Sequence, residues 1–148
     1  METIKRIIEL HGGMVALAAE YIRLENPGYM RLVIEHVGIG PHNGDLVSVA
    51  HYYEQNGDAM RDPEIVFEVE PLWWTPVEYT QDNLGVYQRL LWNDPETKDV
   101  MCAPRALNSV KKFAKMWDTN LREQGFIKAM EQLVAARAGT MEVVNDRV

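Results

Sequence analysis

Apolar side chains recur at every second position through the middle of the chain and at every third or fourth position in its C-terminal part. In residues 29–37, Leu32 and Ile34 alternate with charged and polar residues, which is the pattern of a half-buried strand. The same criteria predict further strands at residues 46–54, 64–70 and 73–80, with 86–92 as a candidate fifth strand. Asn56 and Gly57 favour a tight hairpin turn, because both residues tolerate a positive φ. The pattern therefore predicts an antiparallel β-meander of four to five strands.

The C-terminal part predicts two helices. In residues 105–124, apolar side chains at spacings of three and four form one stripe, which includes Phe113 and Trp117. Gly125 suits the end of this helix, and a second helix is predicted over residues 126–137. The fold class is thus α+β, with the meander packed against C-terminal helices and the helix at 105–124 laid over the sheet.

The N-terminal region is expected to add a short helix. Ile4, Ile7 and Ile8 have helical spacing, and Thr3 is a candidate N-cap. Residues 14–24 fit either a helix or a strand, and we favour a strand from about residue 20. The predicted organisation is a single α+β domain at residues 1–126, an additional helix at 127–138 and a flexible tail at 139–148.

Charge and cysteine content restrict the classes of protein to be considered. The net charge is −7, with 17 acidic and 7 basic residues in 1–103 and 5 acidic and 8 basic residues in 104–148. Nonspecific nucleic-acid binding needs clustered cations, so the acidic body argues against it. Cys102 is the only cysteine, which excludes an internal disulfide, and no apolar run reaches the ~18–20 residues of a membrane span. We therefore expect a cytoplasmic protein.

One segment, residues 51–64, is dense in groups that bind metals, phosphates or protons. The residues that would serve a metal-dependent hydrolase or nuclease are His51, Glu54, Asp58 and Asp62. Their spacing matches no known ligand motif, and residues 51 and 54 of one strand point to opposite faces. The interpretation that we favour is a structural hairpin in which Arg61 pairs with an acid.

Aromatic and basic residues offer two further candidate surfaces. Trp73 and Trp74 are adjacent on a predicted strand and point to opposite faces, so one of them is exposed unless both faces are covered. Asp82 could hydrogen-bond a partner, or form a turn with Gly85. The helix at 105–124 has a basic flank made of Arg105, Lys111, Lys112, Lys115 and Arg122. We interpret this flank as the solvated face of an amphipathic helix, with nucleic-acid binding as the alternative.

Four strings of residues resemble a known family. They are AHYYEQNGD at 50–58, MRDPE at 60–64, QDNLGVYQ at 81–88 and LREQGF at 121–126. In these strings the chain resembles a family of domains of unknown function found in bacteria, phages and integrative mobile elements, over about residues 20–126. The resemblance implies no particular activity. It implies a context in which small accessory proteins often act by binding host or element machinery.

Together these observations predict a non-enzymatic accessory protein of phage or mobile-element origin that binds a protein partner, with inhibition of a host defence system as a specific case. The predicted contact residues are Tyr53, Glu54, Asp58, Arg61, Trp73, Trp74 and Asp82. The alternatives are the metal-dependent hydrolase or nuclease and a nucleic-acid binder that acts through the helix at 105–124. We predict no cofactor and no membrane association. Pro76 places the strand at 73–80 at an edge of the sheet or at a bulge. A homodimer that pairs exposed strands near residues 73–80 is a further alternative.

Overall fold

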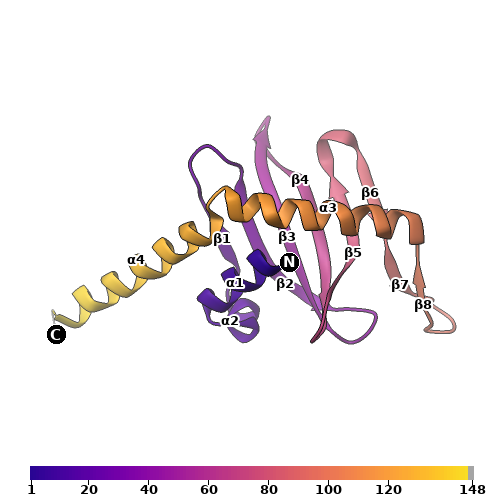
Figure 1. Cartoon of the computed structure of the whole chain (residues 1–148), viewed down its shortest axis with the longest axis horizontal. Helices are drawn as coiled ribbons and strands as arrows, with labels where there is room; N and C mark the ends of the chain where they lie inside the picture. The colour runs from indigo at the N-terminus through magenta and orange to yellow at the C-terminus, as the bar shows by residue number, and fades with distance from the viewer. Residues whose placement is uncertain (147–148) are drawn as a thin grey trace.

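The computed structural model describes the backbone of residues 1–146 and the side chains of residues 1–139. Six antiparallel strands form one sheet in the order of the chain (Figure 1). They are β1 (Ile22–Leu24), β2 (Arg31–Ile39), β3 (Asp45–Gln55), β4 (Asp58–Val69), β5 (Trp74–Gln81) and β6 (Val86–Arg89). A separate two-stranded ribbon consists of β7 (Leu91–Asn93) and β8 (Val100–Cys102). The predicted α+β class and the antiparallel meander are confirmed.

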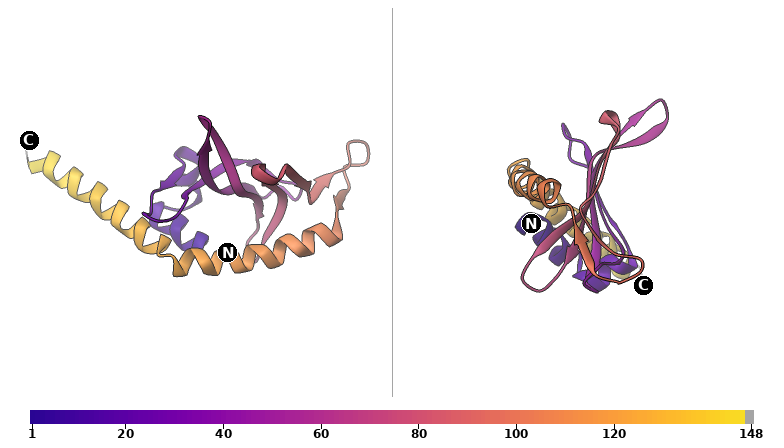
Figure 2. Two further views of the ribbon diagram at one scale, coloured as in Figure 1. Left: turned by 90° about the horizontal axis from the view of Figure 1, so that it is seen from above. Right: turned by 90° about the vertical axis from the view of Figure 1, so that its right-hand side faces the viewer.

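The helices are α1 (Glu2–His11), α2 (Met14–Ala19), α3 (Pro104–Glu123) and α4 (Phe126–Asp146), with a single 3-10 turn, η1 (Asp82–Leu84). Helix α3 crosses the strands on one face of the sheet, and α1 lies on the same side (Figures 1 and 2). None of the helices in the described part of the chain is long and apolar enough to cross a membrane.

The main core lies between α1, α3 and the helix-facing side of the sheet. Leu32 and Ile34 of β2 are fully buried there, as their alternation predicted. Trp117 of α3 is only 5% exposed, and Phe113 stacks against it with ring centroids 6.1 Å apart. The prediction that this helix covers the sheet through Phe113 and Trp117 is confirmed. Burial of a large aromatic side chain stabilises a fold by about 1.5–3 kcal/mol.

Strand β5, which contains Pro76, is an inner strand of the sheet. It pairs with β4 on one side and with β6 on the other, so β1 and β6 are the edges of the sheet. Proline is tolerated because the register shifts here, with Phe67 opposite Pro76 and Val66 opposite Glu78. Of the two positions that Pro76 allowed, the structure has the bulge. Strand β5 is not an edge of the sheet, and the homodimer stays a prediction.

The C-terminal helix is longer than the sequence pattern predicted. Phe126 and Met130 at its start are fully buried in the main core. Helix α4 then continues past residue 138 to Asp146 and leads away from the sheet (Figure 1). Residues 139–146, predicted as a tail, are thus helical, and 147–148 lie outside the described residues.

Candidate functional site

The strings at 60–64 and 81–88 meet in a polar network where β4 passes η1. Arg61 Nε–H donates to Asp82 Oδ2 at 2.9 Å, and Arg61 Nη2–H donates to Asp82 Oδ1 at 3.0 Å. The backbone N–H of Arg61 also donates to Asp82 Oδ2, at 2.8 Å. These hydrogen bonds raise the pKa of Arg61 and lower the pKa of Asp82. Both residues were predicted as partner contacts, and here they join η1 to β4.

The network continues on both sides of this pair. Arg61 lies 3.3 Å from Glu64, which also accepts a hydrogen bond from the Ser48 hydroxyl at 2.7 Å. Asp62 Oδ1 accepts from Gln81 Nε2 at 2.9 Å. The favoured interpretation of the segment, a hairpin whose Arg61 pairs with an acid, is confirmed.

The other predicted hairpin residues lie at or near its tip. Tyr53 and Glu54 of β3 stand opposite Met60 and Ala59 of β4, and Asp58 stands opposite Gln55. Glu54 and Asp58 are exposed, and Tyr53 is half-buried. The hairpin extends beyond α3 in Figure 1. These residues are accessible to a partner. Tyr53 and Glu54 line a shallow pocket with Arg31, which is separate from the pocket that Trp73 and Trp74 line.

His51 is buried, with 6% of the residue exposed, and its ring packs against aromatic rings. It lies 5.5 Å from the Trp117 ring and 5.7 Å from the Phe126 ring. Burial lowers the pKa of His51. Within the described residues, the four predicted metal-site residues form no group of three or more converging ligand atoms.

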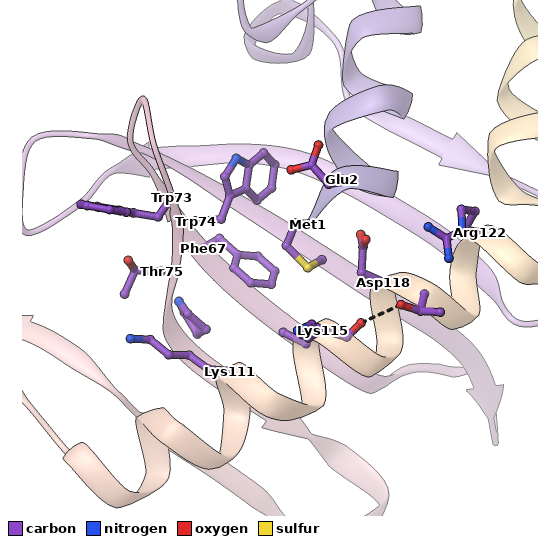
Figure 3. A pocket seen from close by; sticks show the side chains of 13 residues that line it. Met1, Glu2, Phe67, Trp73, Trp74, Thr75, Lys111, Lys115, Asp118 and Arg122 are labelled. Carbon is purple, nitrogen blue, oxygen red and sulfur yellow. Dashed lines mark hydrogen bonds between the residues drawn. The ribbon is translucent and has the colours of Figure 1, made fainter.

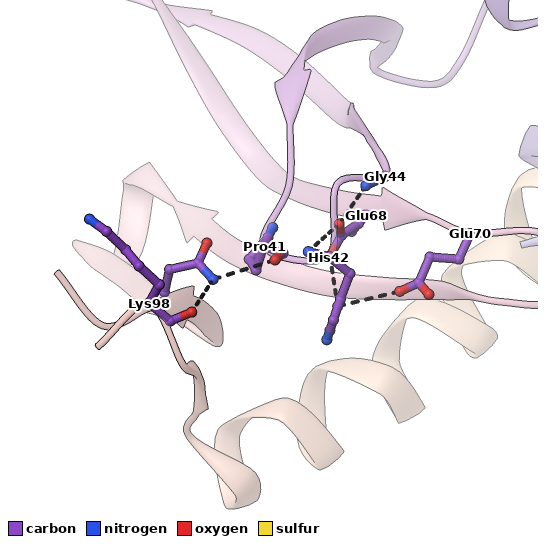
Figure 4. A network of polar contacts seen from close by, with 7 residues as sticks. Pro41, His42, Gly44, Glu68, Glu70 and Lys98 are labelled. Atoms are coloured by element: carbon purple, nitrogen blue, oxygen red, sulfur yellow. Dashed lines mark hydrogen bonds and ion pairs between the residues drawn. The ribbon is translucent and has the colours of Figure 1, made fainter. Parts of the chain in front are cut away.

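A different group does converge, and its members were not singled out from the sequence (Figure 4). Ligand atoms of His42, Glu68 and Glu70 lie within 4.8 Å of one another. The fully buried Glu68 carboxylate accepts the backbone N–H groups of His42 at 2.8 Å and Gly44 at 2.9 Å. His42 Nδ1 lies 3.0 Å from Glu68 and 3.4 Å from Glu70.

These contacts explain the glycines of the loop at 40–44. A Cβ atom on Gly40 would come within 2.6 Å of the Glu68 side chain, and one on Gly44 within 2.6 Å of the Val69 carbonyl. The loop therefore closes tightly around the Glu68 carboxylate. Because the Glu68 carboxylate already accepts two backbone N–H groups of this loop, the arrangement favours a loop anchor.

The two adjacent tryptophans differ in exposure, but Trp73 precedes the strand on which both were predicted, so strand alternation is not the cause. Trp74, the first residue of β5, is half-buried and lies 5.7 Å from the Phe67 ring. Trp73, on the turn before β5, is 59% exposed, and the neighbouring Leu72 is 77% exposed. This turn therefore presents a small apolar surface.

A pocket of about 640 Å³ separates this turn from one flank of α3 (Figure 3). Trp73, Trp74 and Phe67 line it on the sheet side, and Lys111, Lys115 and Arg122 line it on the helix side. We call it the basic groove. Among the described residues, these three cations have no ion pair and no side-chain hydrogen bond with a carboxylate.

The two carboxylates of the basic groove already have partners. Glu2 forms an ion pair with Lys5 at 3.2 Å. Asp118 accepts from the backbone N–H groups of Thr3 at 3.1 Å and Ile4 at 3.3 Å. Asp118 thus satisfies the free N–H groups at the start of α1, where the negative charge also complements the helix dipole. The predicted N-cap, Thr3, instead donates its hydroxyl to the Asp118 carbonyl at 2.9 Å.

Comparison with known proteins gives one match. A family model described as a domain of unknown function, DUF6908, matches residues 2–127. This match ends at the start of α4. No curated protein and no solved structure matches the chain.

Proposed function

The chain belongs to the DUF6908 family of domains of unknown function, and we propose that it is a non-enzymatic protein that binds an acidic segment of a partner protein in the basic groove. The observation that carries this proposal is the exposed Trp73 opposite Lys111, Lys115 and Arg122, which lack carboxylate partners among the described residues. The proposed context remains a phage or mobile element, where the partner would belong to the host.

The charges of the basic groove favour an anionic occupant. Residues 1–103 have a net charge of −10, and most cations of the remaining chain lie on helices. Three cations line the groove against two carboxylates, and Glu2 is paired with Lys5 outside it. The α3 wall therefore keeps a local excess of positive charge on an otherwise acidic protein. Such a local field selects partners whose charge is complementary.

The aromatic side of the groove favours a protein rather than a bare polyanion. Exposed tryptophans are enriched among the residues that contribute most to protein–protein affinity, because they desolvate a large apolar area at one point. Leu72 and Trp73 would receive an apolar side chain of the partner while Lys111 and Lys115 pair with flanking carboxylates. Duplex nucleic acid offers phosphates for the lysines but no apolar side chain for this turn.

The proposal is tested by affinity capture from nuclease-treated host lysate. We expect the wild-type protein to retain one stoichiometric partner, and the triple variant Trp73→Ala/Lys111→Glu/Lys115→Glu to lose it. The matched control is Arg105→Glu/Lys128→Glu, which changes the charge of exposed helical residues outside the groove by the same amount.

Three outcomes have distinct meanings. Loss of the partner in the triple variant alone supports the groove as the binding site. Equal loss in the control would mean that the change in net charge explains the effect. Retention of the partner by the triple variant contradicts the assignment of the groove. If only nucleic acid is captured when nuclease is left out, and its binding falls steeply with salt, the alternative of nucleic-acid binding through α3 replaces the proposal.

A further inference from the structure

The opposite flank of α3 borders a second, smaller hollow of about 230 Å³. Its aromatic walls are Tyr29, Phe113 and Trp117, and its polar lining includes His51, Asp62 and Asn120. We call it the acidic hollow, because Asp62 is its only charged carboxylate and no lysine or arginine lines it. The volume is below the ~300 Å³ at which sites for drug-sized ligands begin, and so suits a single side chain or a small molecule.

Asp62 is held in place but keeps an oxygen free for a ligand. Its Oδ1 atom accepts from Gln81 Nε2 at 2.9 Å, and Gln81 Oε1 in turn accepts from the Tyr79 hydroxyl at 2.7 Å. Within the described residues, Asp62 Oδ2 accepts no hydrogen bond and Asp62 takes part in no ion pair. The carboxylate is therefore positioned by its neighbours without being neutralised by them.

His51 adds a polar ring without a positive charge. Its Nδ1 atom lies 3.3 Å from the Arg31 carbonyl, and a carbonyl can only accept, so Nδ1 carries a proton. Burial lowers the pKa of His51, which favours the neutral ring. The acidic hollow thus presents a carboxylate, a histidine ring and aromatic rings, and no lysine or arginine.

From this lining we propose that the acidic hollow binds a small organic cation, an alkylammonium or guanidinium group, with Asp62 as the counter-ion and the rings of Trp117, Phe113 and Tyr29 as its walls. A partly desolvated carboxylate favours a positive group and repels an anion. Aromatic faces attract cations within about 6 Å of the ring centre. The same head group occurs on free amines and on lysine and arginine side chains. The inference concerns a different cavity from the basic groove and does not depend on the proposed function.

The test is a titration followed by NMR. Methylguanidinium and n-butylammonium are added to the full chain, and the side-chain N–H signals of Trp117 and Asn120 are monitored, with Trp117 assigned by Trp→Phe substitution. We expect saturable shifts at millimolar concentration. Butyrate, which has the same length and the opposite charge, should give none at equal ionic strength.

Matched variants decide whether Asp62 is the counter-ion. Asp62→Asn keeps an oxygen that can accept from Gln81 and removes only the charge, and it should weaken binding about tenfold or more. Asp58→Asn removes the same charge from the exposed hairpin and should leave the dissociation constant unchanged. Equal affinity in Asp62→Asn, equal shifts with butyrate, or no saturable shift with either cation would overturn the proposal.

Two further probes distinguish the sources of the cation. Blocked arginine and lysine amides that bind at least as well as the small probes would assign the hollow to a side chain of a partner protein. Binding of putrescine in preference to the blocked amides would assign it to a free amine. Both results support the cation site.

Discussion

The two flanks of α3 belong to one amphipathic helix but border cavities of opposite charge. On one flank, Lys111 and Lys115 face an exposed tryptophan across the basic groove, whose carboxylates are already paired. On the other, Asp62 faces Trp117 across the acidic hollow, which has no cation in its lining. A single amphipathic helix laid across a sheet therefore creates two sites, because its two edges meet different ends of the strands.

The difference shows that a polar residue near a cavity is informative only once its partners are known. Asp118 and Asp62 are both carboxylates at the edge of α3. Asp118 receives two backbone N–H groups and so completes α1, whereas Asp62 keeps one oxygen without a partner among the described residues. The first is best interpreted as structural, and the second as a candidate binding group.

The largest expected effect on stability comes from truncating Trp117, the buried aromatic residue of α3. Trp117→Ala removes a buried ring that contacts His51 and Phe113, and it should lower the free energy of unfolding by about 3–5 kcal/mol. Denaturant unfolding measures this change. Trp73→Ala, at the exposed tryptophan of the basic groove, serves as control and should change stability by less than about 0.5 kcal/mol. Similar losses in both variants would contradict the contrast drawn between the two tryptophans.

The next effect concerns the carboxylate of the basic groove. Asp118→Ala leaves the N–H groups of Thr3 and Ile4 without an acceptor, and it should destabilise the fold by about 1–2 kcal/mol. Hydrogen exchange should show faster opening of α1 than of the central strands. Glu2→Ala removes the other, exposed carboxylate and should have little effect. A neutral Asp118→Ala variant would mean that water replaces the cap.

A smaller effect is expected in the pH dependence of the free energy of unfolding, through His51 of the acidic hollow. Burial lowers the pKa of His51 below its ordinary value of 6.5. Hydrogen bonds to backbone carbonyls and the charge of Asp62 raise it, but by less. The unfolded chain then binds more protons just below pH 6.5, so the free energy of unfolding falls as the pH falls from 6.5 and levels off below the lowered pKa.

Urea unfolding between pH 7 and 5 measures this slope. His51→Gln should show a smaller slope than the wild type, whatever its absolute stability. The lowered pKa of Asp82 acts only below about its ordinary value of 3.8 and does not interfere. Equal slopes in both proteins would mean that His51 titrates normally.

The smallest effect is expected from the cations of the basic groove. Lys111→Glu/Lys115→Glu should change the free energy of unfolding by no more than about 0.5 kcal/mol, because both side chains are exposed and have no ion pair among the described residues. Thermal unfolding at low salt would reveal any larger change. A marked loss of stability would mean that these lysines stabilise the fold and do not form a free binding surface.

Much of the architecture could be predicted from local pattern. The alternation around Leu32 and Ile34, the hairpin signal at Asn56-Gly57 and the helical stripe ending at Gly125 each depend on neighbours within one turn or one strand. The structure agrees with all three. The position of β5 could not be predicted, because Pro76 suits an edge or a bulge equally and only pairing on both sides decides between them.

The sequence by itself therefore determined the fold class, the antiparallel meander, the long helix that covers it and the buried face of the strand at Leu32 and Ile34. Only the tertiary structure decided which polar residues meet. Asp118 caps α1 through Thr3, which lies 115 residues earlier in the chain. Arg61 of β4 binds Asp82 of the later turn η1. Periodicity reports which way a side chain points, whereas a hydrogen bond between distant residues depends on how whole elements pack. The division of α3 into a basic and an acidic flank arises at that level.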